Sequence, residues 1–123
     1  MAYNVLYPVV IWPAGTSMAT SITSAVTETR LQDNIGFQLN WTGAPVGTFS
    51  FQVSMDYFQD IYGNVVNPGN WTTLPVTPAI TATGTPNTAY VDINQTSSPY
   101  MRVVYTATSG TGTITGYCDG KGI

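Results

Sequence analysis

The most constraining feature of the chain is a pair of alternating segments near its C-terminal end. Residues 100–108 alternate in character, residues 113–118 follow, and a glycine-rich stretch at 109–112 separates them. Because successive side chains of a strand point to opposite faces, one side of the first segment can be buried while the other meets water or a partner. The pattern predicts a β-hairpin whose buried side carries Met101, Val103, Tyr105 and Ala107.

The rest of the chain also reads as short strands closed by glycine, proline or asparagine. Residues 37–41 and 49–55 alternate clearly across a turn at 43–47, and they predict two central strands. Further strands are expected at 19–27, 71–76, 79–82 and 88–93, with a longer loop at 57–69. This spacing predicts an all-β fold, a single antiparallel β-sandwich or jelly roll.

The N-terminal segment is expected to be either an edge strand or an extended arm, because Pro8 interrupts an otherwise β-branched and aromatic run. We therefore divide the chain into residues 1–16 and a sandwich domain at 17–123. As an arm, the segment would need cover from a neighbouring subunit. The assembly contacts expected in that case are Tyr3, Val5, Tyr7, Val9, Ile11 and Trp12.

The same apolar run does not predict export or membrane insertion. It lacks a basic leader, is broken by Pro8 and is followed by Pro13. It is also much shorter than the ~20 apolar residues of a membrane-spanning helix. We expect a protein made in the cytoplasm, with no signal peptide and no membrane partner.

Composition excludes several classes of function. Only 7% of residues are charged and the net charge is −3, so the chain has no basic stripe for a phosphate backbone and we expect no nucleic-acid partner. The sequence has no histidine and one cysteine, which argues against common zinc sites, Ser-His-Asp or Cys-His catalysis and an intrachain disulfide. We expect no catalytic residues, no metal and no cofactor.

Two weaker site hypotheses remain for the carboxylates. A glycosidase would need two of the six acids to face each other across a cleft. Asp56 and Asp60, with Asn64 nearby, could alternatively supply oxygen ligands to calcium. Sparse aspartates in turns more commonly accept hydrogen bonds from the local backbone, and that is the interpretation we favour.

The loop aromatics offer a possible ligand-binding surface. Sandwich proteins can stack sugars on exposed rings, which combine an apolar face with a polar edge. The alternative is that these rings close one end of the sandwich. The residues concerned are Tyr57, Phe58, Tyr62 and Trp71.

Two single residues carry further expectations. Arg102 lies in the middle of a strand, where a covered cation needs a partner, so we expect it to pair with an acid such as Asp92 or to lie at an interface. Cys118 shares a strand face with Ile114, which favours a buried apolar role over a reactive one.

Three segments together carry a family resemblance: residues 51–56 (FQVSMD), 70–74 (NWTTL) and 100–105 (YMRVVY) followed by 109–113 (SGTGT). In this order they resemble small structural proteins of tailed bacteriophage virions, of the capsid decoration, cement or fibre type. They are also similar to the discoidin-type sandwich that binds sugars and lipids. The likeness covers roughly residues 35–118, but the bracketing cysteine pair of discoidin domains is missing.

The phage resemblance implies a non-enzymatic protein located in the virion. Its partners would be the major capsid protein or other virion proteins, and it would form a homo-oligomer, with a trimer favoured. A threonine-rich surface with little charge suits such contacts, because subunits can pack without burying unpaired charge. The alternative function is a module of a phage fibre or tail that binds a host glycan through the loop at 57–71.

Overall fold

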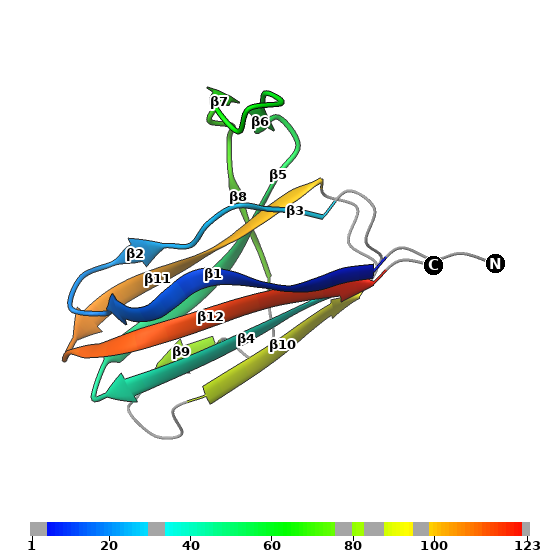
Figure 1. Ribbon diagram of the computed structural model, residues 1–123. Coiled ribbons are helices and arrows are strands. Elements are labelled where there is room, and N and C mark those ends of the chain that lie inside the picture. The colour runs from blue at the N-terminus through cyan, green and yellow to red at the C-terminus, as the bar shows by residue number, and fades with distance from the viewer. Residues whose placement is uncertain (1–4, 30–33, 76–79, 83–87, 95–98, 122–123) are drawn as a thin grey trace.

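The structure is a computed structural model that describes residues 5–29, 34–75, 80–82, 88–94 and 99–121. Two antiparallel sheets pack face to face, and a two-stranded hairpin projects from one of them (Figure 1). The four-stranded sheet has the order β1 (Val5–Ser17), β12 (Gly112–Lys121), β4 (Asn34–Gly43), β10 (Thr88–Asn94). The fold prediction of an all-β sandwich is confirmed.

The second sheet has six strands, most of them short. β11 (Tyr100–Ser109) and β5 (Val46–Ser54) are its long central pair. On the outer side of β11 lie β2 (Ile22–Thr23) and β3 (Thr27–Glu28), and on the outer side of β5 lie β8 (Thr72–Leu74) and β9 (Ile80–Ala82). The projecting hairpin consists of β6 (Phe58–Gln59) and β7 (Val65–Asn67).

The predicted hairpin of the two C-terminal segments is wrong. β11 pairs with β2, β3 and β5, whereas β12 pairs with β1 and β4, so the connection at 109–112 crosses from one sheet to the other. The connection between β4 and β5 crosses in the same way. The four strands β4, β5, β11 and β12 are long and central. β4 is hydrogen-bonded to β12 and β5 to β11, so neither consecutive pair, β4–β5 or β11–β12, forms a hairpin.

The two crossings lie directly against each other, which explains this arrangement. The amide of Ala44 donates a hydrogen bond of 2.9 Å to the carbonyl of Thr111. A Cβ atom on Gly110, whose φ is 79°, would lie 2.0 Å from the carbonyl oxygen of Ala44. A Cβ on Gly112 would lie 2.0 Å from the carbonyl oxygen of Thr42. The glycines therefore allow the backbone at 110–112 to contact the backbone at 42–44 directly. A flat hairpin would not require such a contact.

The inner faces of both sheets form one core. Met101, Val103 and Tyr105 of β11 point inward as the alternation predicts, and all three are fully buried. An aromatic cluster occupies the centre, with Phe49 5.0 Å from Tyr105 and 5.6 Å from Trp41 between ring centroids. The other sheet contributes chiefly Ile35, Phe37, Leu39, Val91, Ile114 and Cys118.

β1 is the edge strand of the four-stranded sheet, bonded to β12 along its length with several register shifts (Figure 1). Ile11 and Trp12 are each only 3% exposed and belong to the core cluster. The amide of Ala25 also donates to the carbonyl of Ile11 at 3.1 Å. The strand is thus joined to the domain by its ladder and by two large buried side chains.

The strand expected at 19–27 is divided into β2 and β3. Ser24 causes the division, because its amide donates to the carbonyl of Val103 while its hydroxyl accepts from the Val103 amide, both at 2.8 Å. A side chain that replaces a ladder acceptor displaces the local backbone from regular pairing. Residues 28–33 have a helix-compatible sequence, but Glu28 belongs to β3, and residues 30–33 lie outside the described residues.

Replacing Gly110 with Ala should test the contact between the crossings. We expect a loss of about 1 to 2 kcal/mol for the left-handed backbone, and a further ~1 to 3 kcal/mol because a neighbouring backbone must move. Gly15→Ala is the matched control, since Gly15 has a φ of 88° but open space around its Cβ position. Equal losses of unfolding free energy in urea for the two variants would contradict the proposed steric role.

Deletion of residues 1–13 should distinguish an edge strand from an arm. Because the deletion removes Ile11 and Trp12 from the core, we expect a protein that is unfolded or strongly destabilised. Circular dichroism and thermal unfolding are the measurements. A truncated chain with the melting temperature of the full chain would show that β1 contributes little to the domain.

Candidate functional site

A stacked column of side chains lies on the outer face of the six-stranded sheet. The ring of Tyr57 packs edge-on against Tyr100, with centroids 5.1 Å apart, and at 5.6 Å against Trp71. The guanidinium carbon of Arg102 lies 4.3 Å from the centroid of the Trp71 ring. We call Tyr57, Tyr100, Trp71 and Arg102 the aromatic column. It joins the chain that follows β5 to the surface of β11.

Arg102 does not pair with Asp92 as the sequence suggested. Asp92 lies on β10 in the other sheet, while Arg102 stands on the outer face of β11. Arg102 instead donates from Nε to Oε1 of Gln52 at 2.8 Å, directly across the β5–β11 ladder. Partial burial lowers the pKa of Arg102. The cation is therefore satisfied by an amide and an aromatic face.

The base of the hairpin is held by a compact hydrogen-bond network. The Asp56 carboxylate accepts from Ser54 Oγ at 2.9 Å, from the Asn70 amide at 2.8 Å and from Asn70 Nδ2 at 2.7 Å. Ser54 Oγ in turn accepts from the Tyr57 amide at 3.1 Å. These bonds, led by the one from the Asn70 backbone, hold the pKa of Asp56 below its ordinary value.

The tip of the hairpin is a turn closed by Asp60. Its carboxylate accepts from the amides of Tyr62 and Asn64, each at 2.9 Å, and from Asn64 Nδ2 at 3.3 Å. The Asn64 backbone bond is the main reason that the pKa of Asp60 lies below its ordinary value. Asp56 and Asp60 thus stabilise two separate turns, as the turn interpretation predicted. Among the described residues, no three acidic, histidine or cysteine side chains converge as metal ligands.

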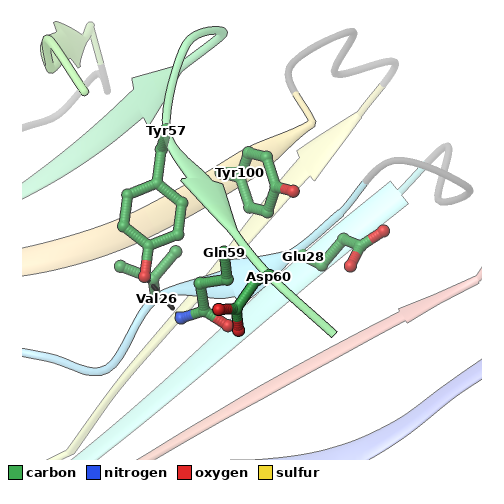
Figure 2. A pocket seen from close by; sticks show the side chains of 6 residues that line it. All are labelled: Val26, Glu28, Tyr57, Gln59, Asp60 and Tyr100. Atoms are coloured by element: carbon green, nitrogen blue, oxygen red, sulfur yellow. Dashed lines mark hydrogen bonds between the residues drawn. The ribbon is translucent and has the colours of Figure 1, made fainter. Parts of the chain in front are cut away.

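A small polar hollow of about 130 Å³ lies between the hairpin and β3. Figure 2 shows Gln59 and Asp60 between Tyr57 on one side and Glu28 on the other. Gln59 Nε2 donates to the Tyr57 hydroxyl, as the dashed line in the figure marks. Two carboxylates, those of Glu28 and Asp60, line the hollow, and the Asp60 carboxylate also accepts the backbone hydrogen bonds of its turn.

The hairpin exposes six large apolar side chains within twelve residues. We call these six residues the apolar hairpin. Four of them were not singled out from the sequence, because Met55 was expected at the end of the strand 49–55 and Ile61, Val65 and Val66 lie in the segment expected to be a loop. Exposed fractions are Met55 76%, Phe58 51%, Ile61 91%, Tyr62 82%, Val65 54% and Val66 62%. The pairing of β6 with β7 brings Phe58, Val65 and Val66 onto one projecting element.

The four loop aromatics therefore separate into two groups. Tyr57 is only 7% exposed and Trp71 is partly covered by Arg102, so both support the hairpin from below. Phe58 and Tyr62 lie on the exposed hairpin itself. The loop does not present the four rings as one open platform.

The six residues expected at an assembly interface are also spread out. Val9 is 40% exposed, whereas Ile11 and Trp12 lie inside the domain and are not available to a second subunit. Val5 and Tyr7 are in the β1 backbone ladder region, and Tyr3 lies outside the described residues. Of this set, the structure therefore places Val9 at the surface.

Cys118 is fully buried on the inner face of β12, beside Ile114 in the core cluster, as expected. Burial raises the pKa of its thiol to about 12. The thiolate is the reactive form of cysteine, so burial disfavours reaction of this side chain. The part of the chain that the structure describes also contains no helix able to cross a membrane.

Comparisons with known proteins do not identify a family. No protein-family model and no curated protein matches the chain. Among solved structures, it is similar to the SPBc2 prophage-derived protein YomS, with 9% identity, a TM-score of 0.49 and coverage of 97% of this chain and 96% of that chain.

Two other solved structures are similar over most of this chain. Infectious bursal disease virus VP2 has 10% identity and a TM-score of 0.45 over 98% of this chain and 32% of that chain. A chitosan-binding module of a Paenibacillus sp. IK-5 chitosanase/glucanase has 23% identity and a TM-score of 0.41 over 85% of this chain and 78% of that chain. At these values the function must be argued from the surface of the chain itself.

Acidification should loosen the tip of the hairpin. A lowered folded-state pKa means that the Asp60 bonds stabilise the turn above its ordinary value of 3.8 and are lost as pH falls through the lowered value. We expect the amide signals of Tyr62 and Asn64 to titrate in NMR spectra with a midpoint below 3.8. Asp60→Asn should abolish that titration, and a midpoint at or above the ordinary value would contradict the assignment.

Proposed function

We propose that this chain is a non-enzymatic structural protein that binds other protein subunits through the apolar hairpin. The observation that carries the proposal is the exposure of six large apolar side chains on one projecting element. Monomeric soluble proteins seldom expose so many large apolar side chains on one short element, since burial of apolar area is favourable by about 25 cal/mol per Å². The hairpin stands clear of both sheets, where a second subunit can reach it (Figure 1).

The electrostatics of the hairpin support the same proposal. Its two carboxylates, Asp56 and Asp60, already accept several hydrogen bonds from neighbouring backbone and side-chain groups. A partner that covers the hairpin would meet rings and methyl groups without having to satisfy a bare charge. The low charge of the whole chain, 7% of residues, extends this property to the rest of the surface.

The support beneath the hairpin reduces the cost of association. Tyr57 is stacked on Trp71 and Tyr100, and Asp56 joins the two ends of the hairpin through Asn70. A surface that is already ordered loses less conformational entropy on binding than a loose loop does. Tyr57 and Trp71 thus serve the interface by holding it in place.

The chemistry of the chain favours a protein without catalytic activity. It has no histidine, its one cysteine is buried, and Asp56 and Asp60 are turn caps. Combined with the phage resemblance of residues 51–56, 70–74, 100–105 and 109–113, this supports a virion component, most specifically a capsid decoration or cement protein. In that role it would form a trimer and stabilise the shell by binding the major capsid protein.

A charge placed on the hairpin should disrupt assembly. We expect the purified chain to sediment as a trimer, and Ile61→Asp to weaken association by at least about tenfold, because an unpaired carboxylate would be buried at the contact. Analytical ultracentrifugation over a dilution series measures this. Circular dichroism should remain unchanged, since Ile61 is 91% exposed in the domain.

Thr108→Asp is the matched control, because it adds the same charge at an exposed position on β11 away from the hairpin. It should leave the sedimentation coefficient unchanged. A wild-type chain that remains monomeric at high concentration, or a Thr108→Asp variant that dissociates like Ile61→Asp, would overturn the assignment of the hairpin as the contact.

A further inference from the structure

The outer face of the four-stranded sheet carries a row of side chains that neither the hairpin nor the core uses. The register aligns Val10 with Tyr117, Tyr117 with Gln38, and Gln38 with Tyr90, so the row crosses all four strands. We call these four residues the tyrosine row. Tyr90 is 67% exposed, Val10 49% and Tyr117 36%.

The Tyr90 side chain packs along the surface of the sheet and does not project away from it. A Cβ atom on Gly36 would be 2.8 Å from the Tyr90 hydroxyl oxygen and 3.3 Å from Cζ, so the ring extends over the bare backbone at Gly36. Any larger residue at position 36 would displace it. One face of the ring is therefore turned to the sheet while the remainder of the side chain is open to solvent.

Polar groups flank the tyrosine row on both sides. On one side Thr88, Asn40 and Thr115 are aligned, and Asn40 Oδ1 accepts from Thr88 Oγ1 at 2.7 Å and from Gln38 Nε2 at 3.3 Å. On the other side Gly36 is aligned with Asp92 and with Asp119, which are both exposed. Ring faces, an oriented amide pair and two carboxylates thus share one open surface.

We infer that this face binds a linear oligosaccharide that carries no acidic groups. Sugar rings present an apolar face that packs on aromatic rings and hydroxyl groups that hydrogen-bond to amides and carboxylates. Tyr117 and Tyr90 are two strands apart, which corresponds to about 10 Å and gives room for more than one sugar ring.

Charge decides the class of saccharide. Among the side chains that the structure describes on this face, the charged ones are the carboxylates Asp92 and Asp119. They repel uronic acids, sulfated glycans and phosphate-bearing polymers, whereas neutral sugars and amino sugars meet acceptors. The site is distinct from the loop aromatics, and its existence does not depend on the assembly role of the hairpin.

Isothermal titration calorimetry with β-1,4-linked hexamers of glucose, N-acetylglucosamine and glucosamine tests the inference on the full chain. At least one should bind saturably, and polygalacturonate should not bind. Tyr90→Ala should weaken that binding by roughly tenfold, the loss expected for one aromatic stacking contact. Gly36→Ala should weaken it as well, because it displaces the Tyr90 ring without removing it.

Tyr62→Ala is the matched control, since it removes an exposed tyrosine from the hairpin and should leave sugar affinity unchanged. Amide shifts in NMR spectra should map to Gln38, Tyr90 and Tyr117. The inference is overturned if no neutral or amino oligosaccharide binds more tightly than about 10 mM, if Tyr62→Ala weakens binding as much as Tyr90→Ala, or if the shifts map to the hairpin.

Discussion

The contact between the two crossings organises this sandwich. Gly43, Gly110 and Gly112 let the backbone at 42–44 touch the backbone at 110–112, so both connections leave one sheet and enter the other at the same point. Beyond this contact, β4 pairs with β12 and β5 pairs with β11. The inner faces of these four strands then enclose the aromatic cluster around Phe49, and the remaining strands add to their edges.

This arrangement also positions the apolar hairpin and the tyrosine row. β5 begins at the crossings and ends at Ser54, where the hydrogen-bond network with Asp56 and Asn70 starts the hairpin. The apolar hairpin is thus held at the end of β5 that is farthest from the crossings, while the tyrosine row lies on the opposite sheet. Two different surfaces can therefore act without competing for the same residues.

Alternation in the sequence predicted which residues of β4, β5 and β11 point inward, because burial of one strand face is a local property. It did not predict strand partners, since a glycine-rich connection serves equally for a hairpin and for a crossing between sheets. Arg102 shows the consequence: Asp92 looked like a suitable partner by charge, but the real partners, Gln52 and Trp71, depend on which strands share a sheet.

The apolar hairpin and the tyrosine row could not be predicted from the sequence for the same reason. Gly36 lies just before the predicted strand at 37–41 and was not singled out, and only the strand register shows that the Tyr90 ring lies against it. Likewise, Ile61 and Val66 are separated by turn residues and are brought onto one projecting element only when β6 pairs with β7. In a chain with so few charges, the position of rings and methyl groups in the fold determines where other molecules can bind, and that position follows from long-range pairing.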